Sequence, residues 1–200
     1  MKPAVPAKLP IASIRWEDLI PGIGRANRAL ARYDGLLAAL PNADILLAPM
    51  ATQEAVLSSR IEGTQATFGE ILKADAGEPP AEADRELDVL EVVNYRRALR
   101  QAIGSLDKRP FSLNLLRGMH VTLLDSVRGQ DQARGRFRST QNWIGPSGST
   151  IESAYFVPPE AGKLPNAMSS WEKYYHADAP DALVQLAVIH GQFEFLHPFL

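Results

Sequence analysis

Apolar residues recur every three or four positions along most of the chain, which is the period of an α-helix with one buried face. Proline, glycine and asparagine separate these stretches, because they end helices or begin turns. The pattern predicts a mainly α protein. We expect helices over residues 22–40, 43–61, 64–74, 82–106, 112–127, 158–176 and 181–196.

The stretch from 128 to 160 has a different pattern. Glycine, serine, proline and β-branched residues replace the helical period there. Two short strands, Ser139–Gly145 and Ile151–Val157, fit around the turn residues Pro146–Ser149. The sequence therefore predicts a β-hairpin on an otherwise helical body.

The charges nearly cancel over the 200 residues, with 21 basic and 23 acidic side chains and a formal net charge of −2. Such a balance offers no general attraction to nucleic acid or to an anionic membrane. A local basic cluster at 128–138 is diluted by Asp131, so we do not assign it to nucleic-acid binding. We expect the charges of the helix at 82–106 to form a solvated face.

The chain has no cysteine, which excludes disulfides, thiolate catalysis and cysteine-ligated zinc. Its first ten residues carry three prolines and no continuous apolar run, so they fit neither a signal peptide nor a membrane span. We expect these residues to form an extended arm over the domain. We also expect a cytoplasmic protein.

A histidine followed by a proline ends the last expected helix. Pro198 disfavours the α conformation for the residue before it, so His197 should leave the helix and stand at its C-terminus. A histidine there can act as a general base near neutral pH, or it can simply cap helix carbonyls. The residue type leaves both roles open. His120 lies on the buried face of its helix, and we expect it to be structural.

The residues around this histidine resemble the opening of the Fic family signature. That signature reads His-Pro-Phe, any residue, an acidic residue, Gly-Asn-Gly-Arg, two further residues and a second arginine. The run His197–Leu200 matches its first four positions. A distant stretch, Ser58–Gly63, fits the inhibitory pattern of many Fic proteins, which is Ser or Thr, three residues, Glu, then Gly or Asn. Further matches extend the resemblance to roughly residues 10–200, namely Glu91–Tyr95, Gly135–Arg138 and Asn142–Gly145.

The resemblance implies a Fic-type helical bundle with a β-hairpin flap. The break at Gly77–Pro80 is the best internal boundary. We therefore expect an N-terminal Fic-associated helical region with the inhibitory helix at 1–80 and a Fic core at 81–200. In this family the flap clamps an extended segment of the target protein by strand addition. The residues that this assigns to target binding are Asn142, Trp143, Ile144 and Gly145.

The activity that the resemblance implies is transfer of AMP from ATP, with Mg²⁺, to a hydroxyl of a target protein. His197 would remove the proton from a serine, threonine or tyrosine hydroxyl as it attacks the α-phosphate. Pro198 and Phe199 would be signature residues beside this base. The partners implied are a target protein, the chain itself through self-modification, and a second copy in a homodimer.

The second motif implies autoinhibition. Glu62 would pair with the second arginine of the signature and occupy space that the γ-phosphate of ATP needs. Ser58 lies four residues earlier on the same helix face, where its hydroxyl can steady the glutamate or the nucleotide. Gly63 would end the helix in the left-handed conformation.

The signature is incomplete within the 200 residues. Its acidic Mg²⁺ ligand, glycine-rich turn and arginines would follow Leu200, so we assign no metal ligand within residues 1–200. We expect the chain to be truncated within the motif and inactive as it stands. Members with this kind of N-terminal region often continue into a winged-helix domain, which would be the only part that binds nucleic acid.

Three alternatives remain open. Some relatives transfer a phosphoryl or phosphocholine group instead of AMP. The chain can also be a non-catalytic module, if its hairpin recruits a peptide and its helices are only a scaffold. A third reading is metal binding by His190 and His197, which are seven residues apart and have no established carboxylate partner.

Overall fold

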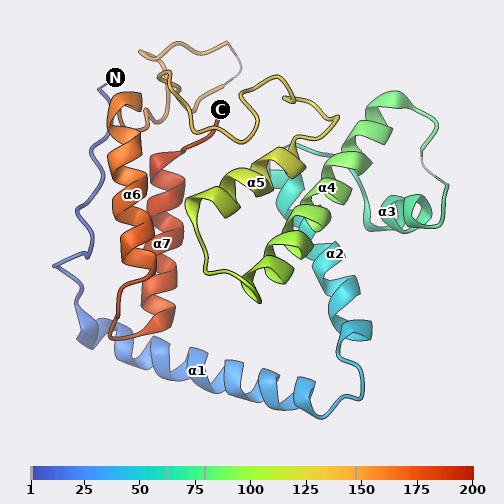
Figure 1. The fold of residues 1–200 in the computed structure, drawn as a ribbon, viewed down its shortest axis with the longest axis horizontal. Coiled ribbons are helices and arrows are strands. Elements are labelled where there is room, and N and C mark those ends of the chain that lie inside the picture. The colour runs from blue at the N-terminus through green and yellow to red at the C-terminus, as the bar shows by residue number, and fades with distance from the viewer. Residues whose placement is uncertain (1, 62, 79, 147) are drawn as a thin grey trace. The chain divides into compact units, whose positions relative to one another are not determined.

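The structure is a computed structural model that describes residues 2–61, 63–78, 80–146 and 148–200. It is built almost entirely of helices (Figure 1), so the predicted mainly α fold is confirmed. The elements are α1 (Trp16–Ala38), α2 (Asp44–Ile61), α3 (Phe68–Asp75), α4 (Ala83–Leu106), α5 (Leu113–Leu123), the 3₁₀ turn η1 (Ala161–Lys163), α6 (Leu164–Tyr175) and α7 (Ala182–Leu196).

The helix starts follow from capping side chains. The Ser112 hydroxyl accepts a hydrogen bond from the Leu115 N–H at the start of α5, and Asp181 accepts two at the start of α7. Thr67 and Glu70 form a reciprocal capping box at the start of α3. Pro49 lies inside α2 without ending it, so the helix does not start afresh after Ala48.

The contacts divide the chain into two compact units, Met1–Asp34 with Arg136–Leu200, and Gly35–Gly135. The division expected between residues 80 and 81 stays a prediction about domains, which need not follow compactness. We describe each unit by itself. Helix α1 begins in the first unit and ends in the second, and none of its residues is buried.

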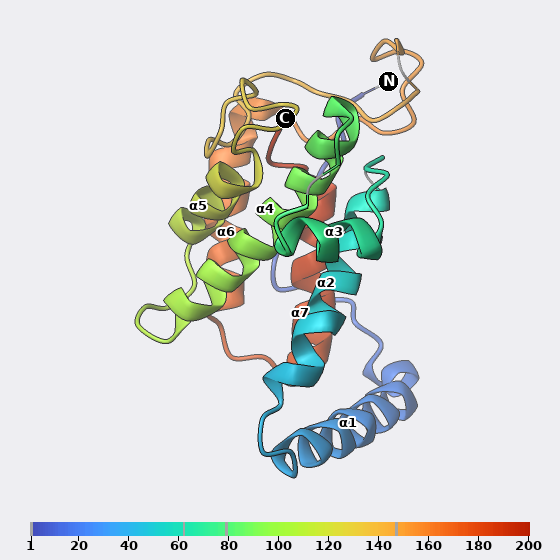
Figure 2. The same cartoon turned by 90° about the vertical axis from the view of Figure 1, so that its right-hand side faces the viewer.

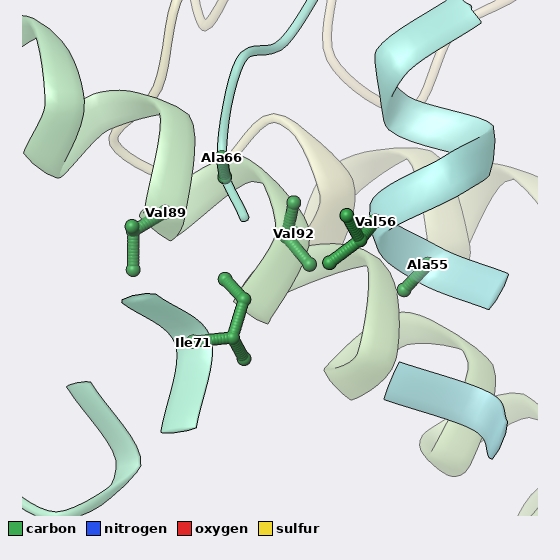
Figure 3. Packing of buried hydrophobic residues seen from close by; sticks show 6 residues of the cluster. All are labelled: Ala55, Val56, Ala66, Ile71, Val89 and Val92. Carbon is green, nitrogen blue, oxygen red and sulfur yellow. The ribbon is translucent and has the colours of Figure 1, made fainter. Parts of the chain in front are cut away.

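The unit Gly35–Gly135 is organised around α4, which packs against α2, α3 and α5 (Figure 2). Its apolar centre brings together short side chains from three helices and the loop before α3 (Figure 3). Burying such side chains contributes roughly 25 cal/mol per Å² of apolar surface removed from water. The members of this cluster are Ala55, Val56, Ala66, Ile71, Val89 and Val92.

The charges of α4 do not all lie on a solvated face, so that expectation was wrong. Asp88 is only 5% exposed, and it accepts hydrogen bonds from Arg128 and from the backbone N–H of Gln65. Glu91 accepts from Thr64 Oγ1 at 2.6 Å and from Arg128 Nε at 2.8 Å. A buried carboxylate is stable only when it is paired in this way, and the pairing fixes the residues after α2 to α4.

In the other unit, α6 and α7 form an antiparallel helical hairpin (Figure 1). Trp171 joins them, because its Nε1–H donates to the Ile189 carbonyl at 2.8 Å and its ring lies 5.6 Å from that of Phe193. The N-terminal arm is extended and bonded to this unit, as its proline content predicts. Ala4 N–H donates to Val157, and Gln192 Nε2 donates to the Ala7 carbonyl.

The predicted β-hairpin is reduced to one antiparallel bridge, between Ile144 and Phe156. Neither Ser139–Gly145 nor Ile151–Val157 forms a strand in the part of the chain that the structure describes. The physical reason is that side chains bond carbonyls near the bridge in place of ladder N–H groups. Arg138 Nη1 donates to the Thr140 carbonyl at 3.3 Å, and Gln141 Nε2 donates to that of Asn142 at 3.1 Å, both within the first expected strand. Pro158 and Pro159, which follow the second expected strand, also lack a backbone N–H to donate.

Within the described ranges, no helix has both the length and the apolar character needed to cross a membrane.

Gly135 occupies a position that a side chain would disturb. It has φ +69°, and an added Cβ would lie 2.4 Å from Val121 Cγ2 and 3.2 Å from the Arg117 carbonyl oxygen. We expect Gly135→Ala to lower the free energy of unfolding in urea by about 1–3 kcal/mol. Gly118→Ala is the control, because that helical glycine meets nothing within 4 Å, and it should stabilise by about 0.5–1 kcal/mol. Equal effects of both changes would contradict the prediction.

Candidate active site

His197 stands at the C-terminus of α7 in the left-handed conformation, with φ 42° and ψ 64°. Its backbone N–H still donates to the Phe193 carbonyl at 3.1 Å, so it closes the last turn of the helix. The following Pro198 excludes the α conformation, as the sequence predicts. A left-handed residue other than glycine costs on the order of 1 kcal/mol and persists only where its surroundings hold it. The residues around this half-buried histidine must therefore stabilise its left-handed backbone conformation.

The holding group is Arg138, which is only 3% exposed. Its Nε donates to the His197 carbonyl at 2.9 Å, and its Nη2 donates to the carbonyl of Leu196 at 3.2 Å. Nη2 and Nη1 also donate to the carbonyls of Pro159 and Thr140, at 2.6 and 3.3 Å. All of these partners are backbone oxygens. Burial lowers the pKa of the guanidinium from its ordinary value, and the group remains a cation at any physiological pH.

The residues after His197 are held from the same segment. Arg138 N–H donates to the Pro198 carbonyl at 2.8 Å, and Asn142 Nδ2 donates to that of Phe199 at 3.3 Å. The Phe199 ring lies 5.2 Å from the ring of Phe137. Asn142 thus lies beside the signature residues, where the sequence had assigned it only to target binding.

The other residues assigned to the flap are exposed at the surface, namely Trp143, Ile144 and Gly145. Trp143 and Ile144 are each 41% exposed, and Ile144 exchanges backbone hydrogen bonds with Phe156 at 2.8 and 3.1 Å. Gly145 has no space for a side chain, because an added Cβ would lie 2.6 Å from Ser149 Oγ. His197 and the exposed residues Trp143 and Ile144 thus lie in the same unit.

The residues of the inhibitory motif belong to the unit Gly35–Gly135. Ser58 Oγ donates to Glu54 Oε1 at 2.6 Å, and the Tyr95 hydroxyl donates to the same oxygen at 3.0 Å. Gly63 has φ +103° and its N–H donates to the Arg60 carbonyl, so it ends α2 as the sequence predicts. Glu62 lies outside the described residues. Its inhibitory role, like that of Ser58, stays a prediction.

Two models of one family match nearly the whole chain. The Fic/DOC family N-terminal model covers residues 20–104, and the Fic/DOC family model covers residues 110–200. The chain belongs to the Fic/DOC family. The resemblance read from His197–Leu200 and Ser58–Gly63 is thereby confirmed.

Solved Fic structures share the fold. One is a Fic family protein from Desulfovibrio desulfuricans G20, with a TM-score of 0.63 and 21% identity over 100% of this chain and 55% of that one. Another is a Fic domain containing signaling protein from Bacteroides thetaiotaomicron VPI-5482, with a TM-score of 0.68 and 20% identity over 86% of this chain and 65% of that one. This chain therefore spans between half and two thirds of their lengths.

In the described part of this Fic chain, no group of three or more His, Asp or Glu side chains is placed to hold a metal ion. His190 is exposed on α7, and the described residues form no metal-binding group that contains both His190 and His197. His120 is buried, and its Nδ1 accepts from the Gly135 N–H at 3.0 Å. Burial and the charge of Arg134 lower its pKa, which suits a neutral structural histidine.

Sequence reasoning missed two parts of the Fic site. Arg138 was read as one member of a basic cluster, although it is the residue that holds the signature histidine. Glu54 was not singled out, although it lies four residues before Ser58 and accepts its hydroxyl. The spacing of Glu54 was a usable signal, because residues four apart share a helix face. Arg138 lies in the Gly135–Arg138 family match, but that match does not identify its partners, since they are backbone carbonyls.

Proposed function

We propose that this Fic chain is the main part of a protein adenylyltransferase, which moves AMP from ATP to a hydroxyl of a target protein. The observation that carries the proposal is His197, a histidine held at a helix end by a buried arginine and lying in the same unit as an exposed peptide edge. Membership of the Fic family supports transfer of a nucleoside monophosphate to proteins in general.

His197 would act on the acceptor side of the reaction. The attacking hydroxyl needs a base within hydrogen-bond reach, and a histidine side chain is the commonest such base in enzymes. Fixing the backbone on either side of the ring limits where the base can go, which lowers the entropic cost of reaching the reactive arrangement. The proton moves from the acceptor oxygen to the imidazole while the acceptor oxygen bonds to the α-phosphorus of ATP. The bond from that phosphorus to the oxygen bridging the α- and β-phosphates breaks, and pyrophosphate leaves.

The target would present its hydroxyl on an extended segment laid along Trp143 and Ile144. Trp143 and Ile144 are each 41% exposed, so their side chains offer apolar contact to such a segment. ATP supplies the AMP and Mg²⁺ would neutralise its phosphates when bound. The described residues include no group of three or more His, Asp or Glu side chains that could hold Mg²⁺, so we assign the metal no residue here.

A labelling experiment separates this proposal from its nearest alternatives. A chain that carries the complete signature is incubated with Mg²⁺ and ATP labelled either at the α- or the γ-phosphate. We expect protein-bound label only from α-labelled ATP, because AMP retains the α-phosphate. Label from γ-labelled ATP would indicate phosphoryl transfer, and label only from a phosphocholine donor would indicate the third chemistry.

A non-catalytic peptide-binding module is the second candidate function. The specific observation that favours it is the exposed edge at Trp143 and Ile144, which can bind an extended peptide whether or not chemistry follows. Absence of any transferred label, together with measurable peptide binding, would favour this candidate over the transferase.

A further inference from the structure

Two residues, Arg138 and Asn142, donate hydrogen bonds to four consecutive carbonyl groups, those of residues 196 to 199. The Arg138 side chain bonds the carbonyls of Leu196 and His197, and its backbone N–H bonds that of Pro198. Asn142 completes the series at Phe199. Arg138 and Asn142, which lead into the candidate flap, thus bond the carbonyl of each residue from 196 to 199. These four residues include the candidate base His197.

The electrostatics of this arrangement are favourable for a buried cation. The last carbonyls of a helix lack partners within the helix and carry partial negative charge. Arg138 supplies donors and positive charge to the end of α7 from outside that helix, at 3% exposure. Among the described residues, the hydrogen-bond partners of this guanidinium are carbonyl oxygens. Its charge is therefore compensated by the helix end and by two further carbonyls, those of Thr140 and Pro159.

The same side chain also joins both flanks of the candidate flap. Thr140 precedes the bridge residue Ile144, and Pro159 follows its partner Phe156. A displacement of either flank therefore changes a carbonyl that Arg138 bonds, and Arg138 bonds the peptide group of His197 directly at 2.9 Å.

We propose that Arg138 is a positioning residue, which keeps His197 in its left-handed conformation and in register with the segment that would receive the target. Asn142 assists by fixing the next carbonyl along. The inference rests on the proposed function for its catalytic consequence, but its geometric part concerns only His197. The proposal predicts that positive charge alone cannot replace Arg138, because several N–H donors of its guanidinium are needed at the same time.

Arg138→Lys is the informative change, because lysine keeps the charge and most of the length. Its single ammonium cannot occupy the places of Nε and Nη2 at once, so the bonds to His197 and to Pro159 cannot both survive. Arg136→Lys is the matched control, since Arg136 is exposed and lies two residues earlier in the same segment.

The activity arm uses the chain with the complete signature and compares kcat with KM. We expect Arg138→Lys to lower kcat about tenfold and to leave KM for ATP within about twofold, because orientation of the base affects the chemical step more than nucleotide binding. Arg136→Lys should leave both values unchanged. A folded Arg138→Lys variant with normal kcat, or a loss confined to KM, would overturn the proposal.

The spectroscopic arm needs no activity. Histidine ring signals of the 200-residue chain are recorded by NMR for the unaltered protein and both variants. We expect the His197 signals to shift or broaden in Arg138→Lys alone, with the exposed His190 on the same helix unchanged in every sample. Unmoved His197 signals, or equal changes at His190, would overturn the proposal. If the unaltered complete chain transfers nothing, the proposed function fails and this arm still decides the positioning role.

Discussion

Replacing His197 with alanine is expected to reduce AMP transfer by about a thousandfold in a chain that carries the complete signature, since a positioned general base contributes roughly 10²–10⁴ in rate. Affinity for ATP should change by less than about threefold, because the base acts on the acceptor hydroxyl and not on the nucleotide. Transfer of α-label to the target and ATP titration measure the two quantities separately.

A second variant removes an ambiguity of the alanine change. Alanine at φ 42° is strained, whereas asparagine adopts the left-handed conformation readily. His197→Asn should therefore keep the helix end intact and lose transfer to the same extent. His190→Ala is the control for loss of a histidine from α7 and should retain full activity. Normal transfer by folded His197→Asn would remove His197 from the mechanism.

The helices were predictable because their signals are local. Local signals at Asp181, Ser112 and Pro198 each act within a few residues. They predict the helix starts and the departure of His197 from its helix, but they do not specify its left-handed conformation. The left-handed Gly63 after α2 was found for the same reason. The family resemblance then identified which helix end to examine.

The parts that sequence missed depend on contacts between distant residues. The Arg138 side chain bonds carbonyls up to 59 positions away, and a carbonyl oxygen is the same at every residue. The family match at Gly135–Arg138 therefore does not reveal which groups Arg138 bonds. The hairpin failed for a related reason. Arg138 and Gln141 donate side-chain hydrogen bonds to the carbonyls of Thr140 and Asn142, which lie within the first expected strand. Likewise Asp88 reads as a surface charge until Arg128, forty residues later, is placed beside it.

Replacing Glu62 with glycine is expected to raise self-modification by roughly 30- to 150-fold in a chain with the complete signature. The reason is that a carboxylate and a γ-phosphate would compete for one guanidinium, and a charge-assisted hydrogen bond of this kind contributes about 2–3 kcal/mol. Glu62 is the member of the Ser58–Gly63 motif that carries a carboxylate. Incorporation of α-label into the chain itself measures the change.

The charge can be separated from the shape of the side chain. Glu62→Gln keeps the size of the glutamate and should also activate, by a smaller factor, because a neutral amide competes less well than a carboxylate for an arginine. Glu78→Gly, an exposed glutamate in the same unit, controls for the loss of any acidic residue and should leave self-modification unchanged. If both Glu62 variants fold and label themselves no faster than the unaltered chain, Glu62 does not inhibit. Activation by glycine but not by glutamine would mean that its bulk, and not its charge, excludes the nucleotide.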